Sequence, residues 1–138
     1  MTTEKCVILL DQTLPVGLLA NAAAILGVSL GKALPQAVGR DVFDCTDHIH
    51  RGIIEFPVPI LRGTAEDLRN LRKRLYEPEF ADMLTVDFSD LAQSCKTYAE
   101  FTEKMEAARE DELRYLGLAV CGTKKQVTRL TGSLPLLR

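Results

Sequence analysis

Near the start of the chain, the side chains best suited to chemistry are Asp11 and Thr13, which follow an apolar run over residues 5–10. Pro15 and a nearly uncharged, Ala-rich segment come next, so the pattern predicts a strand, a short turn and a helix. Ligands of open α/β sheets collect beyond the carboxyl ends of strands, and a helix N-terminus favours anions. The alternative interpretation is a turn acid beside a helix-capping threonine.

Asn21 is the only polar side chain between Thr13 and Ser29. We expect it to be buried in the first helix, and a buried amide needs hydrogen-bond partners. Two interpretations stay open: Asn21 ties the helix to neighbouring backbone, or it faces a ligand.

A second group of polar side chains lies in residues 44–50, where His48 and His50 would share one face of an extended segment. Asp44 and Cys45 stand nearby, and imidazole, thiolate and carboxylate are all zinc-compatible ligands. Because no distant second pair of ligands accompanies them, the simpler interpretation is a polar turn before a strand. A general-base role for one histidine is a further alternative. We therefore expect no metal and no cofactor.

The third group follows an apolar run over residues 113–121, where Gly122 and Thr123 precede a short basic helix. Lys124 and Lys125 stand in its first turn, where they oppose the helix dipole. This local conflict indicates an anion or acidic partner, although exposed lysines tolerate the position at small cost. The predicted ligand-binding set is therefore Asp11, Thr13, Asn21, Gly122, Thr123 and Lys125.

The elements that position these residues alternate along the chain as four helices and four or five strands, which favours a sheet covered on both faces. Pro57 and Pro59 stand two apart in a predicted strand over residues 52–62, and neither can donate to a ladder. That strand must lie at a sheet edge. The other predicted strands span 5–10, 83–88 and 113–121, with residues 134–137 as the optional fifth. The helices span 15–30, 64–77, 98–108 and 123–130.

The first helix is apolar around most of its circumference, with small side chains at residues 20 and 22–24. A helix of this kind must be buried on more than one side. We expect the sheet on one side, and on the other a second helix or another subunit.

Composition places the chain among ordinary globular proteins, because 138 residues with 46% hydrophobic and 26% charged side chains suit a single domain over 1–138. A net charge of −2 gives no basic surplus, so we do not expect a nucleic-acid partner. The N-terminus lacks signal-peptide features, and residues 14–30 are marginal for a membrane span. The four cysteines are widely spaced, so we expect reduced thiols in a cytoplasmic protein with no membrane contact.

Four stretches carry a resemblance: DQTLPVGLLANAAAILG, HIHRGIIEFPVPIL, FSDLAQSCKTYAEF and the run from Leu116 to Arg138. Together they resemble an uncharacterised bacterial family, domain of unknown function two thousand, within the type II peptidyl-tRNA hydrolase superfamily. The resemblance covers nearly the whole chain. It implies a three-layer α/β/α sandwich around a mixed four- to five-stranded sheet, and a homodimer.

The hydrolase pattern is only partly present. Asp11 and Gly17 fit it, but Leu18, Ala22 and Ile25 stand where those enzymes have Lys, Gln and His. Residues 120–122, Val-Cys-Gly, stand where the enzymes have an Asp-Ala-Gly turn. The resemblance therefore implies a binding module for a small anionic or nucleotide-like ligand. The alternative is a hydrolase of peptidyl-tRNA or a related acyl ester whose site is rebuilt around His50 and Lys125, with tRNA as its partner.

Overall fold

The fold is organised by one apolar strand, β1 (Lys5–Asp11), in a computed structural model that describes residues 3–138. Alternate side chains of β1 enter two cores: Val7 and Leu9 pack on one face of the sheet, and Cys6, Ile8 and Leu10 on the other. Such a strand has no solvent-facing side, which explains its continuous apolar run.

Four strands form a mixed sheet in the order β4-β1-β6-β5, with β4 at Ile60–Gly63, β5 at Leu84–Ser89 and β6 at Tyr115–Gly122. β4 runs parallel to β1, whereas β6 is antiparallel to both β1 and β5. The carboxyl ends of β1, β4 and β5 therefore share one edge with the amino end of β6. We call this the carboxyl edge, and the opposite one the amino edge.

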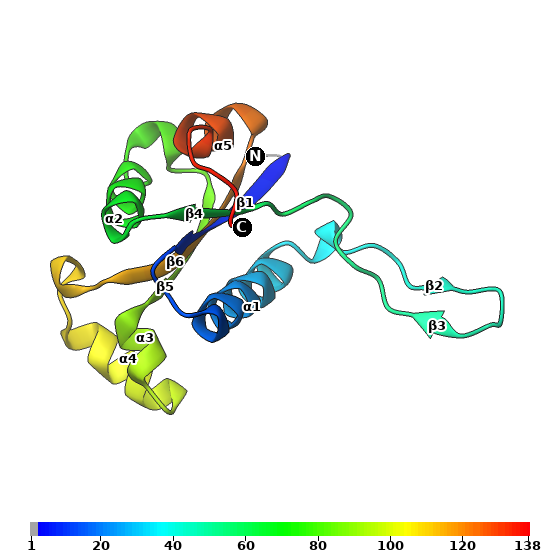
Figure 1. Ribbon diagram of the computed structural model, residues 1–138, viewed down its shortest axis with the longest axis horizontal. Helices are drawn as coiled ribbons and strands as arrows, with labels where there is room; N and C mark the ends of the chain where they lie inside the picture. The colour runs from blue at the N-terminus through cyan, green and yellow to red at the C-terminus, as the bar shows by residue number, and fades with distance from the viewer. Residues whose placement is uncertain (1–2) are drawn as a thin grey trace.

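Helices cover both faces of the sheet (Figure 1). α1 (Val16–Ala33) packs on the Cys6 face, while α2 (Ala65–Arg74) and α5 (Lys124–Thr131) pack on the other. α3 (Asp90–Ser94) and α4 (Tyr98–Ala107) follow β5, and three short 3₁₀ helices span Pro35–Ala37, Pro78–Phe80 and Glu110–Glu112. The predicted mixed α/β class is confirmed, with four strands in this sheet and five α-helices across residues 3–138.

The strand predicted over residues 52–62 does lie at a sheet edge, but it is shorter than predicted. β4 is an edge strand, as Pro57 and Pro59 require, but it begins only at Ile60. On its outer side β4 is covered by the last residues of the chain, because Arg62 N donates to Pro135 O and Leu137 N donates to Ile60 O. Thr13 does not cap α1, whose N-cap residue is Pro15 without a side-chain hydrogen bond.

Residues 38–56, which we call the arm, form an extended hairpin that projects away from the sheet (Figure 1). Its strands β2 (Val42–Phe43) and β3 (Ile49–His50) pair antiparallel. At its base Gly39 N donates to Ile53 O, and a Cβ on Gly52 would lie 1.7 Å from the carbonyl oxygen of Gly39. Only glycine fits there, so the two arm segments approach closely.

The expectation that α1 is buried on more than one side is not met within this chain. Only Ala22, Leu26 and Leu30 of its 18 residues are buried, all against the sheet. By length and composition alone, α1 with its mean hydropathy of 1.5 could also cross a membrane. The outer face of α1 is therefore apolar and uncovered.

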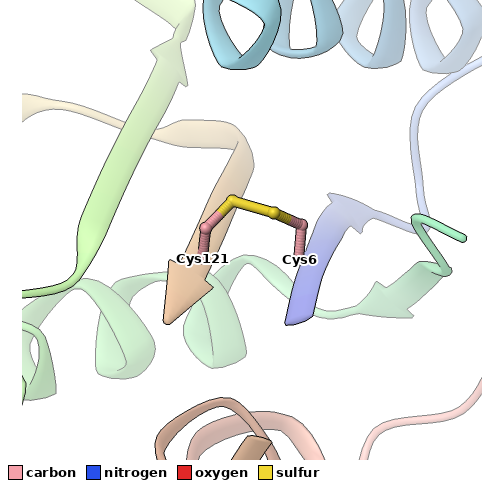
Figure 2. Close-up of a disulfide and its surroundings, with 2 residues drawn as sticks. All are labelled: Cys6 and Cys121. Atoms are coloured by element: carbon pink, nitrogen blue, oxygen red, sulfur yellow. A yellow bond between two sulfur atoms is a disulfide. The ribbon is translucent and has the colours of Figure 1, made fainter. Parts of the chain in front are cut away.

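Cys6 and Cys121 form a disulfide between β1 and β6, so the expectation of reduced thiols is wrong for this pair (Figure 2). They are 115 residues apart in sequence but directly opposite in the antiparallel register, with Cα atoms 4.2 Å apart. Spacing along the chain could not reveal that register. Cys45 and Cys95 remain free thiols.

We predict that alkylation of the unfolded protein modifies two thiols without reductant and four after reduction. A disulfide that closes so long a loop stabilises a domain by about 2–5 kcal/mol, so reduction should lower the urea midpoint by a corresponding amount. Cys45→Ser is the matched control, because Cys45 is exposed and unpaired, and its midpoint should not change. Four reactive thiols in protein that has never met a reductant would contradict the bond.

Candidate functional site

Asp11 is the anchor of the carboxyl edge. It ends β1 with no solvent exposure, yet it is charged. Its Oδ1 accepts hydrogen bonds from Thr13 N at 2.9 Å and Thr13 Oγ1 at 2.7 Å, and its Oδ2 accepts one from Arg114 Nη2 at 2.6 Å. Both carboxylate oxygens are thus satisfied, as a buried charge requires.

The hydrogen bonds keep Asp11 ionised. Burial alone would raise the pKa of Asp11, but the hydrogen bonds from Thr13 and Arg114 outweigh burial, and the pKa lies below its ordinary value of 3.8. A carboxylate held in this way is a poor general base at neutral pH. Its role in this geometry is to hold Arg114.

Arg114 is also fixed through its backbone. Its N–H donates to Asp90 Oδ1 at 3.1 Å, and its carbonyl accepts a hydrogen bond from Asp90 N at 2.9 Å. The guanidinium additionally donates to Thr13 Oγ1 at 3.2 Å. With its Asp11 contact buried and 49% of its side chain exposed, Arg114 presents a positioned cation to solvent.

The connections around Asp11 leave the sheet in opposite directions. The chain passes from β1 into α1 on one face, whereas it passes from the parallel neighbour β4 into α2 on the other. Adjacent parallel strands with divergent connections create a switch point, where α/β folds place ligands. Gln12 N, donating to Gly63 O at 2.9 Å, joins the two strand ends.

The N-terminus of α1 adds positive potential beside Arg114. The first N–H groups of a helix lack intrahelical partners, and Pro15 supplies no side-chain cap. The first turn contains no acidic residue, and Val16 and Gly17 are exposed. A half-unit of positive charge at this end therefore faces solvent.

Asn21 is exposed, so its predicted burial is wrong. Its Nδ2 donates to Gln93 Oε1 of α3 at 3.4 Å. The amide thus reaches across from α1 to the segment after β5, on the same edge as Asp11. Asp11, Thr13 and Asn21 from the predicted set therefore lie together at the carboxyl edge.

Gly122, Thr123 and Lys125 lie at the amino edge, because antiparallel pairing sets Gly122 opposite Lys5. Thr123 caps α5 reciprocally with Gln126, and a Cβ on Gly122 would come within 2.8 Å of that glutamine's Oε1. Packing and capping account for both residues. The structure does not bring this half of the predicted set to Asp11.

Cavities at the amino edge have mixed character. A depression of about 730 Å³ beside the start of β5 is lined by Glu55 and Asp82 among mainly apolar residues, which suits no anion. A neighbouring depression of about 470 Å³ is lined by Lys5 and Lys124 but also by Glu4. Neither contains a cation held in place as Arg114 is by Asp11 and Thr13.

At the tip of the arm, Asp44 accepts hydrogen bonds from Thr46, from His48 N and from His50 Nε2, the last at 2.7 Å. These bonds hold the pKa of Asp44 well below its usual range. Cys45 is exposed, and no cluster of three metal-ligating side chains occurs within residues 3–138. The predicted polar turn accounts for this group, and His50 lies on a different element from Lys125.

Sequence reasoning missed Arg114 and a second polar network. Tyr76 and Tyr115 both donate to Glu110, and Arg72 lies 3.6 Å from Asp87, whose pKa is raised by burial. The side chain of Arg72, on α2, is mostly buried. In the sequence Arg114 is marked only by its place directly before the strand at 115–122, which does not reveal its contact with Asp11.

Comparisons with known proteins add a family and a fold. The profile of a family described as "Protein of unknown function (DUF2000)" matches residues 4–138. The solved structure of a protein of unknown function from Agrobacterium tumefaciens strain C58 superposes with a TM-score of 0.88. It is 18% identical in sequence, and the match covers 100% of both chains. No curated protein matches the chain.

We predict that Asp11→Asn destabilises the protein by about 1–3 kcal/mol at neutral pH, because hydrogen bonds to a charged group are lost. Because the pKa of Asp11 is lower in the folded protein than its unfolded value of 3.8, ionised Asp11 stabilises the fold at pH values above 3.8. This stabilisation is lost as the pH falls through the folded-state pKa. The gap in urea-unfolding free energy between wild type and Asp11→Asn should therefore narrow below pH 4. A gap that stays constant down to pH 2.5 would contradict an ionised Asp11.

Proposed function

Since the chain belongs to the DUF2000 family of proteins of unknown function, we propose its function from the geometry of the carboxyl edge. The protein is a single α/β domain that binds a small anionic ligand, nucleotide-like ligands included. One observation carries the proposal: the half-exposed guanidinium of Arg114 is held by buried Asp11 at the switch point.

Arg114 suits a planar or tetrahedral oxyanion. A guanidinium presents five N–H donors in a rigid fork, and here Nη2 serves Asp11 and Thr13. Within residues 3–138, the structure gives the other side-chain donors of Arg114 no acceptor. Because Asp11 and the Asp90 turn fix the side chain in advance, little conformational entropy is lost when an anion binds.

The surroundings support an anion with a larger neutral part. The open N-terminus of α1 supplies backbone N–H groups for a phosphate or carboxylate. Asn21 and Gln93 form an exposed amide pair with donors and acceptors for uncharged polar groups. Exposed Val16 offers an apolar contact. These groups come from α1 and α3, on either side of Arg114.

We further propose a type II peptidyl-tRNA hydrolase-like fold that lacks the hydrolase chemistry. The mixed sheet and the strand-end Asp11 support the likeness. The positions corresponding to the hydrolase Lys, Gln and His carry Leu18, Ala22 and Ile25, none of which can donate a proton or stabilise an oxyanion. Residues 120–122, which correspond to the Asp-Ala-Gly turn of the hydrolases, contain Cys121, and Cys121 is bonded to Cys6.

We propose the cytoplasm as the compartment, on the ordinary charge and composition of the chain. The Cys6–Cys121 bond opposes this location, because disulfides are rare in the cytosol. Reduced Cys6 and Cys121 thiols in freshly lysed cells would support the cytoplasm, whereas a disulfide there would oppose it.

We predict that inorganic phosphate and nucleoside monophosphates shift the backbone amide signals of residues 16–18 and the Arg114 Nε–H signal in NMR titrations. The shifts should saturate and remain confined to the carboxyl edge. Arg114→Lys keeps the charge but loses the fork, and it should weaken binding about tenfold.

Arg109→Lys is the matched control, because the Arg109 side chain is exposed and pairs with Asp111 rather than with Asp11. Its affinity should equal that of the wild type. Shifts that never saturate, or equal affinity in the Arg114→Lys variant, would refute the site.

We predict no release of peptide from peptidyl-tRNA with enzyme in excess over substrate. The physical reason is that no cation, amide or imidazole stands at the three α1 positions. Release that disappears in His50→Ala or Lys125→Ala would instead favour a hydrolase with a rebuilt site. A peptidyl-tRNA hydrolase of the type II family serves as the positive control.

A further inference from the structure

The chain exposes more surface than its mass requires. A compact monomer of 15.3 kDa exposes about 7,100 Å² by the usual scaling of surface with mass. This chain exposes 8794 Å², so the excess is about 1,600 Å². Each partner in a standard protein–protein interface buries about 800 Å². The excess is therefore large enough for an extensive interface.

The arm adds exposed apolar side chains to this surface. Phe43 and Ile49 are paired across the hairpin and are 66% and 47% exposed, and Ile53 is 79% exposed. The polar contacts of the arm are internal: Asp41 binds Arg51 and the backbone of Gly52, and Asp44 orders the tip. The hairpin is therefore held in shape while Phe43, Ile49 and Ile53 remain exposed.

The second uncovered apolar surface is the outer face of α1. Gly17, Gly27 and Gly31 lie on α1, and a Cβ at any of them would meet nothing within 4 Å. Packing within this chain therefore does not require these glycines. Each glycine weakens a helix relative to alanine, so their presence indicates a close approach by something outside the chain.

A cavity connects the two surfaces. It has about 190 Å³, is almost entirely apolar, and lies between α1, β1 and the base of the arm, with Gly27, Gly31, Val38 and Ile54 in its wall. An apolar cavity of about 150 Å³ holds a benzene molecule. This cavity therefore admits one aromatic ring.

We propose that two copies of this chain form a symmetric dimer in which each arm covers α1 of the other copy. Phe43 of the partner subunit then packs on the glycine face of α1, at the mouth of the cavity. Both complementary surfaces occur on one chain, so a two-fold axis satisfies both at once and the assembly closes. This proposal does not depend on an anion at Arg114.

The alternative occupant of α1 is a lipid surface, since the helix is long and apolar. Helices that lie in a membrane interface expose large apolar side chains and carry a basic polar face. The outer face of α1 exposes Val16, Ile25 and Val28 among its small residues, but Lys32 is the only charged residue of the helix, so α1 has no basic polar face. Small residues suit the close packing of protein against protein.

The test is the molar mass in solution, by light scattering at micromolar concentrations, for wild type and two variants. We expect wild type at twice 15.3 kDa. Phe43→Asp alters the arm and Gly27→Arg alters α1, and each should raise the dissociation constant of the dimer by at least about thirtyfold. Because Gly27 faces open space in the monomer, its replacement should not unfold the chain.

Two matched controls separate a specific effect from a general one. Tyr98→Asp changes another exposed aromatic, and Ala107→Arg changes another exposed position on a helix, both on α4. Both controls should remain dimeric. Circular dichroism and melting curves check that all four variants are folded.

Mixing the two variants tests the arm-to-α1 contact itself. A mixed dimer joins the intact arm of the Gly27→Arg chain to the intact α1 of the Phe43→Asp chain, so one of its two contacts survives. Native mass spectrometry should therefore show more mixed dimer than either variant alone forms.

The proposal fails if wild type is monomeric, if both variants stay dimeric, or if mixing yields no mixed dimer, which would indicate arm-to-arm contacts. A wild-type monomer that sediments with vesicles of phosphatidylcholine and phosphatidylglycerol would instead assign α1 to a lipid surface.

Discussion

The buried contact between Asp11 and Arg114 is the constraint on which the carboxyl edge depends. It joins the end of the first strand to the beginning of the last, across 103 positions of sequence. Removing a carboxylate from water is costly, and only a full set of donors offsets that cost. Thr13 and Arg114 supply these donors. The side chain of Asp11 therefore fixes the turn after β1 and the start of β6, and Arg114 in turn binds the Asp90 turn.

Antiparallel β6 divides the molecule into two chemically different edges. Had β6 run parallel to β1, the glycine and lysines that follow it would have joined Asp11 in one cleft. Instead Gly122 lies beside Lys5, and Arg114, which precedes β6, takes the position near Asp11. The direction of a single strand therefore decides which cation lies at the carboxyl edge.

The sequence could predict local elements well because their signals are local. The apolar run of β1 and the proline restriction on β4 each act over a few residues, and both are present. The disulfide and the Arg114 contact depend on strand direction and register, which no local pattern encodes. The exposure of Asn21 follows from the uncovered outer face of α1, which the sequence predicted to be covered. The arm was missed because two-residue strands carry almost no periodicity.

The order in which the strands are made has a consequence for synthesis of the protein. β1 leaves the ribosome well before its partner β6, which ends at Gly122. At about 5–20 residues per second, β1 waits roughly 6–20 seconds for that partner. Throughout this interval the side of β1 that later pairs with β6 has no partner, although β4 on its other side has already been made. The nascent chain is thus most vulnerable to aggregation in the part that becomes the centre of the finished sheet.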